Sequence, residues 1–138
     1  MDLAAARHQI ESAFVRMNAL YQRPLFDEWA ILSPSAKHGV LAYAGRREQS
    51  FRQSLPRDAE PLRAAVAGRR FDPGEFEFAS DAAGTRYDAC MKIGPTAFLV
   101  FNNTTLSMSD IRSNPPWLKA QTVFFDLGEK FRADPLEA

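Results

Sequence analysis

The feature that most constrains the fold is a run of three strand patterns joined by two short turns, between residues 75 and 101. In the first pattern, Phe76 and Phe78 alternate with two glutamates, which is the period of a strand with one buried face. The third pattern, residues 96–101, is apolar on both sides and suits a central strand. In the middle pattern one face carries Tyr87, Ala89, Met91 and Ile93, and the other carries Asp88, Cys90 and Lys92. Two short turns in succession favour an antiparallel meander.

Two further apolar runs, residues 29–32 and 40–44, precede the meander. The segment between them, residues 33–39, has the Ser, Pro and Gly composition of a turn. We therefore predict a β-hairpin with a long loop. Neither run alternates cleanly between apolar and polar residues, as expected for strands that are covered on both faces.

Three helical regions surround these strands. The first is indicated by apolar residues spaced four, three and four apart, namely Ile10, Phe14, Met17 and Tyr21. Asp2 is a suitable N-cap for it. The second region, residues 46–67, is more polar and contains two prolines. We predict that the third begins with Asn114 as N-cap and the following prolines in its first turn, and that it stops at Asp134.

The resulting order is α-β-β-α-β-β-β-α, which predicts a single α+β domain over residues 1–138. A five-stranded antiparallel sheet with helices packed on its faces is the layered arrangement that buries all the apolar faces. The chain has 138 residues, of which 46% are hydrophobic. That is enough for one core without disulfides or metals to stabilise it.

Charge and cysteine content exclude several classes of partner and location. The 17 basic and 17 acidic residues cancel, so no overall field favours nucleic acid or an anionic membrane. No apolar run approaches the roughly 20 residues of a membrane span, and the N-terminus lacks the pattern of a signal peptide. Cys90 is the only cysteine, which fits a reducing compartment. We therefore expect a cytoplasmic protein that binds neither nucleic acid nor membrane.

The order of elements resembles the roadblock branch of the profilin-like fold, which includes dynein light chains and bacterial regulators of small Ras-like GTPases. The resemblance rests on the helix 10–21 leading into the hairpin 29–44, on a helix that ends at Ala67-Gly68, and on the meander followed by a terminal helix. It covers most of the chain. It implies a non-enzymatic homodimer that regulates a small GTPase or scaffolds a complex.

The resemblance also implies a dimer interface. The strand containing Phe76 and Phe78 would lie at the edge of the sheet and pair with its twin, and the second helices would pack together through Leu62 and Val66. An exposed edge strand that carries phenylalanine is prone to aggregate unless it is paired or covered. The alternative is that all four residues are ordinary core residues.

The sequence contains no recognisable constellation of catalytic residues. His8 and His38 have no partner at metal-binding spacing and no identifiable neighbour to orient them. Cys90, in a predicted strand, lacks the helix N-terminus or nearby histidine that activates a thiol. Gly-rich and Walker phosphate-binding motifs are also missing from the sequence. We therefore predict that the protein is not an enzyme, with no catalytic, metal-binding or cofactor-binding residue and no cofactor.

Several clusters leave two interpretations open. The Asn-Asn-Thr-Thr segment, residues 102–105, either hydrogen-bonds a ligand or turns the chain and caps the next helix. Arginines 46–47 and 69–70 form either a binding patch or a solvated helix face. Glu75 and Glu77 either bind a cation or lie on an exposed strand face. The aromatic terminal helix either packs against the first helix and the sheet or offers side chains to a partner. The alternative function is therefore a small-molecule sensor with a pocket between sheet and helices.

Overall fold

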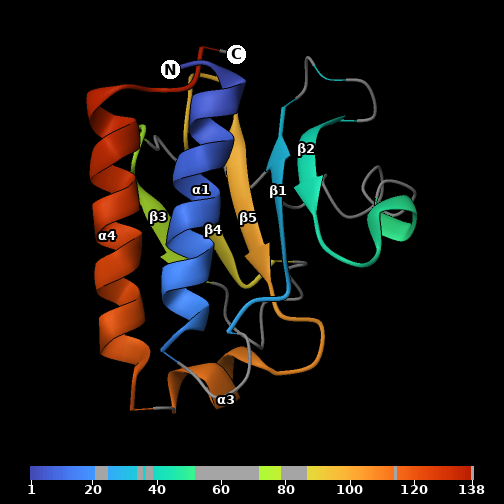
Figure 1. The fold of residues 1–138 in the computed structure, drawn as a ribbon, viewed down its shortest axis with the longest axis vertical. Helices are drawn as coiled ribbons and strands as arrows, with labels where there is room; N and C mark the ends of the chain where they lie inside the picture. Colours follow the sequence, from blue (N-terminus) through green and yellow to red (C-terminus); the bar gives the residue numbers. More distant parts are fainter. Residues whose placement is uncertain are drawn as a thin grey trace.

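The computed structural model describes residues 1–20, 25–33, 36, 39–51, 72–78, 87–113 and 115–137. In this part of the chain the protein has the predicted α+β architecture, with a five-stranded sheet and helices packed on it (Figure 1). Its elements are α1 (Leu3–Asn18), β1 (Glu28–Leu32), β2 (Val40–Ala44), β3 (Phe76–Phe78), β4 (Ala89–Lys92), β5 (Phe98–Asn102), α3 (Met108–Arg112) and α4 (Trp117–Ala133).

The sheet is antiparallel throughout, with the strand order β2-β1-β5-β4-β3. The predicted hairpin forms its β2-β1 side, and the predicted meander forms its β5-β4-β3 side. The two units join in the centre, where Glu28 of β1 lies opposite Asn102 of β5. Every residue of β1 is buried, in agreement with the prediction from its unbroken apolar pattern that it is covered on both faces.

One face of the sheet is covered by α1 and α4, which lie side by side (Figure 1). The side chain of Asp2 accepts a hydrogen bond from the backbone N–H of Ala5 and caps α1, as predicted. The buried face of α1 carries Ala6, Ile10, Ala13 and Met17. Of the residues predicted for this face, Phe14 is half-buried and Tyr21 lies outside the described residues. None of the described helices is long and apolar enough to span a membrane.

The start of α4 differs from the prediction. The helix begins at Trp117 after Pro116, with no side-chain cap, and Asn114 lies outside the described residues. Pro115 precedes a second proline, and the residue before a proline avoids helical backbone angles, so the first proline is kept out of the helix. The predicted end of the helix is confirmed, because α4 stops at Ala133 and Asp134 follows as its C-cap.

The opposite face of the sheet carries a second, smaller apolar cluster. It consists of Ala30, Leu32, Val40, Phe51, Tyr87, Cys90 and Val100. Tyr87 therefore lies with Cys90, and its predicted place on the face of Met91 is wrong. The reason is that β4 begins only at Ala89, so the alternation of the strand does not extend back to Tyr87. Of the predicted helical region 46–67, residues 48–51 are helical, and the rest from residue 52 onward lies outside the described residues.

Candidate functional site

The predicted interface residues Phe76 and Phe78 belong to β3, which lies at one edge of the sheet. Both side chains are half-buried and lie against α4. The ring of Phe78 lies 4.7 Å from that of Trp117 and 5.1 Å from that of Phe124, between centroids. Their rings thus contribute to the packing of the helical layer, while the strand that carries them is an edge strand. Leu62 and Val66, the other predicted interface residues, lie outside the described residues.

Two large apolar side chains of α4 remain exposed beside this strand. Leu118 is 74% exposed and Phe125 is 61% exposed. Because they are seven residues apart, they lie on the same face of the helix. The Phe125 ring contacts the ring of Phe76 at 5.1 Å, which places this face next to β3. We call the surface formed by β3, Leu118 and Phe125 the β3–α4 edge.

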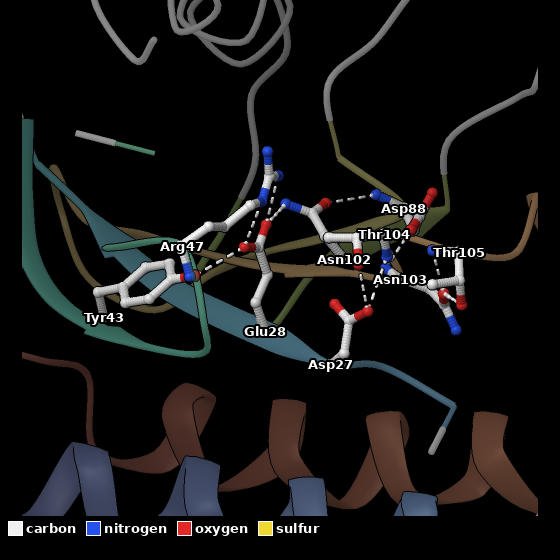
Figure 2. Close-up of polar contacts among 9 residues, drawn as sticks. All are labelled: Asp27, Glu28, Tyr43, Arg47, Asp88, Asn102, Asn103, Thr104 and Thr105. Atoms are coloured by element: carbon white, nitrogen blue, oxygen red, sulfur yellow. Dashed lines mark hydrogen bonds and ion pairs between the residues drawn. The ribbon is translucent and has the colours of Figure 1, made fainter. Parts of the chain in front are cut away.

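A polar network surrounds a buried carboxylate on β1, away from the β3 edge of the sheet (Figure 2). Glu28 of β1 is only 1% exposed, and both of its oxygens are fully engaged. Its Oε1 accepts hydrogen bonds from the Tyr43 hydroxyl and from Nε of Arg47, each at 2.8 Å. Its Oε2 accepts from Nη2 of Arg47 at 2.7 Å and from Nδ2 of Asn102 at 2.8 Å. Four hydrogen bonds therefore compensate for burying the charge.

These contacts fix the charge states of the network. Burial alone raises the pKa of Glu28, but the hydrogen bonds from Arg47, Asn102 and Tyr43 outweigh it and lower that pKa below its ordinary value. The hydrogen bonds to Glu28 raise the pKa of Arg47. Burial, together with the neighbouring Glu28 carboxylate, raises the pKa of Tyr43 to about 12. At neutral pH the network thus consists of a carboxylate, a guanidinium and a neutral phenol, which is a stable ion pair and not a proton donor or acceptor for catalysis.

The segment 102–105 does turn the chain. Oδ1 of Asn103 accepts hydrogen bonds from the backbone N–H groups of Thr105 and Leu106, each at 2.8 Å. Ser107 then caps α3 in a capping box with Asp110. The first residue of the segment has a second role that the sequence did not reveal, because Asn102 also holds Glu28.

A cleft of about 620 Å³ opens between the end of α1, the start of β1 and the 103–106 turn. It is lined by Phe14, Asn18, Phe26, Asp27, Glu28, Arg46, Arg47, Asn103, Thr104, Thr105 and Leu106. Oδ2 of Asp27 accepts hydrogen bonds from the backbone N–H of Thr104 at 3.0 Å and from its hydroxyl at 2.5 Å. Oδ1 of Asp27 is buried and has no hydrogen-bond partner. The cleft therefore combines apolar walls with polar groups that are not all satisfied.

The other candidates from the sequence remain apart from the cleft. His8 is exposed on α1, Cys90 is buried in β4, and His38 lies outside the described residues. Glu77 accepts a hydrogen bond from the Tyr87 hydroxyl at 2.7 Å, so it is tied to the opposite face of the sheet. Arginines 69 and 70 lie outside the described residues. Within the described ranges, no group of three or more His, Cys, Asp or Glu side chains is placed to hold a metal ion.

Sequence reasoning missed the pairing of Glu28 with Arg47. A weak signal was present, because Glu28 directly precedes an unbroken apolar strand and a buried carboxylate needs a cationic partner. Nothing in the sequence distinguished Arg47 from the adjacent Arg46 as that partner. Comparisons with protein-family models, with curated proteins and with solved structures found no match for this chain.

Proposed function

We propose that this domain is a non-enzymatic interaction module that forms a homodimer through the β3–α4 edge. The observation that carries the proposal is the exposure of Leu118 and Phe125 directly beside an edge strand. Edge strands offer unpaired backbone N–H and C=O groups, and exposed apolar side chains next to them favour pairing with another chain.

A two-fold axis suits this surface. An antiparallel strand that pairs with its own copy places equivalent residues across the axis, so Phe125 of one protomer would approach α4 of its partner. The two exposed side chains then lose their contact with water without any change in the fold. β3 has only three residues, so the side chains of α4 must supply most of the buried area.

The role of the dimer follows from the resemblance to roadblock proteins. On that basis the dimer regulates a small Ras-like GTPase or scaffolds a larger complex. A cytoplasmic location, expected from the single cysteine, belongs to the same proposal. The conclusion that the protein is not an enzyme is supported by the saturated hydrogen bonding of Glu28, the most buried carboxylate described.

The test is size-exclusion chromatography with light scattering on the wild type and on Phe125→Asp. We expect a wild-type dimer and a dissociation constant at least about tenfold higher in the variant, equivalent to about 1.4 kcal/mol. Val15→Asp is the matched control, because Val15 is 67% exposed on α1 and outside the β3–α4 edge. A wild type that stays monomeric at high concentration, or equal weakening by Val15→Asp, would show that the proposal is wrong.

A further inference from the structure

The cleft beside Asp27 is separate from the β3–α4 edge and contains an unpaired cation. Arg46 is exposed at the cleft and makes no hydrogen bond or ion pair with any residue that the structure describes. Its neighbour Arg47 holds both oxygens of Glu28, and the two remaining acceptor positions of that carboxylate are taken by Tyr43 and Asn102. Glu28 is thus saturated and does not pair with Arg46. A guanidinium in this position is suited to bind a carboxylate through two parallel hydrogen bonds.

The same cleft contains an unpaired acceptor. Both hydrogen bonds from Thr104 go to Oδ2 of Asp27, which leaves Oδ1 without a donor. A buried carboxylate oxygen without a donor is uncommon in folded proteins and is often completed by a ligand or an ordered water. Asp27 itself is half-buried and lines the cleft. An ammonium or hydroxyl group of a ligand would supply that donor.

Part of the remaining wall is apolar. Phe14 and Leu106 are half-buried and line the cleft. A cleft volume of about 620 Å³ falls within the range that holds small organic ligands. An anion without a donor would leave Asp27 unpaired, and an amine without an acid would leave Arg46 unpaired. Both groups are satisfied by one molecule that carries an acid, a donor and an apolar body.

We propose that this cleft binds a small α-amino acid or α-hydroxy acid with an apolar side chain. The ligand carboxylate pairs with Arg46, its α-ammonium or α-hydroxyl group donates to Asp27, and its side chain packs on Phe14 and Leu106. The three substituents sit on one α-carbon, so a single small molecule of this class offers the acid, the donor and the apolar group together. This inference does not rest on the homodimer, since no residue of the β3–α4 edge lines the cleft.

A matched set of four compounds separates the three contacts. L-phenylalanine and L-3-phenyllactate carry the acid, the donor and the aromatic ring. 3-Phenylpropionate lacks the donor, and 2-phenylethylamine lacks the acid. In isothermal titration calorimetry, we expect the first two to bind saturably and the last two to bind at least tenfold more weakly. Equal binding of all four compounds, or no saturable binding of the first two at millimolar concentration, would overturn the proposal.

Three variants assign the contacts to residues. Arg46→Gln is expected to lower the affinity for L-phenylalanine at least tenfold and to leave the affinity for 2-phenylethylamine unchanged. Asp27→Asn is expected to lower the affinity for L-phenylalanine and to leave the affinity for 3-phenylpropionate unchanged. Arg7→Gln, an exposed arginine of α1 that does not line the cleft, is the matched control and should change nothing. Thermal unfolding of each variant checks that it is folded. If Arg7→Gln lowers affinity as much as Arg46→Gln, the cation at the cleft has no specific role and the proposal fails.

Discussion

The backbones of Gly74 and Gly128 touch where α4 passes the turn that leads into β3. A Cβ atom built on Gly128 would lie 2.5 Å from the carbonyl oxygen of Gly74, which is closer than real Cβ contacts. A Cβ on Gly74 would in turn collide with the carbonyl oxygen of Gly128, and Gly74 has the positive φ of 92° that favours glycine. The two glycines therefore allow the helix to lie directly on the edge of the sheet.

This contact predicts an unusual sign for a helix substitution. An alanine normally stabilises an exposed helix by about 0.8–1.0 kcal/mol relative to glycine. Here Gly128→Ala is expected to lower the free energy of unfolding by about 1–3 kcal/mol, because the new methyl group forces α4 away from Gly74. Urea unfolding measures the change. Lys119→Ala, at an exposed position of the same helix, should stay within about 0.5 kcal/mol of the wild type. A stabilised Gly128→Ala protein would contradict the packing described here.

The Glu28 network predicts a specific pH dependence. The pKa of Glu28 is lowered in the folded protein from an ordinary value of 4.5. The network therefore stabilises the fold fully above that value, and the stabilisation is lost as pH falls through the lower folded pKa. At pH 7, Glu28→Gln should lower the free energy of unfolding by about 2–3 kcal/mol, since it weakens charged hydrogen bonds.

The gap between wild type and Glu28→Gln is the quantity to follow, because other carboxylates titrate in both proteins. We expect the gap to be constant from pH 7 to pH 5 and to shrink on further acidification. Denaturant unfolding at a series of pH values measures it. A gap that grows as the pH falls would mean that Glu28 is protonated more easily in the folded protein than in the unfolded one.

Burial makes Cys90 a slow thiol. Its pKa is raised to about 12, first by burial and then by the nearby charge of Glu77. At pH 8 nearly all of the thiol is protonated, and only the thiolate reacts with disulfide reagents. Native protein should therefore react with an aromatic disulfide reagent far more slowly than protein unfolded in urea. If the native protein is labelled as fast as the unfolded chain, the buried position of Cys90 in β4 is contradicted.

The predicted fold rested on patterns that are local in the sequence. The apolar runs at 29–32 and 40–44 became β1 and β2 with bounds within a residue, and the 96–101 run became the central strand β5. Such local patterns predict strands correctly because each strand buries at least one face, whichever neighbour it pairs with. The errors lie at element ends. The start of α4 depends on the two prolines that precede it. The sheet face on which Tyr87 lies depends on which residue is the first of β4.

The candidate site was much harder to predict from the sequence. Glu28, Arg47 and Asn102 meet only because β1 lies between β2 and β5, and this order depends on long-range packing. The turn at 102–105 was one of the two interpretations that its own residue types supported, since asparagine and threonine hydrogen-bond their neighbours. Its contact with Asp27 was not predictable, because it joins segments 77 residues apart.

The central position of β1 and β5 has a consequence for protein synthesis. Glu28 and Asn102 are separated by 74 residues, so the ribosome must complete most of the chain before these two strands can pair. Until then β1 can bond only to β2, and its other side offers open backbone groups in the growing chain. Contacts this distant in sequence also slow folding. During synthesis the chain thus passes through a stage in which only part of the sheet can form. Chaperone binding at this stage would protect it most against aggregation.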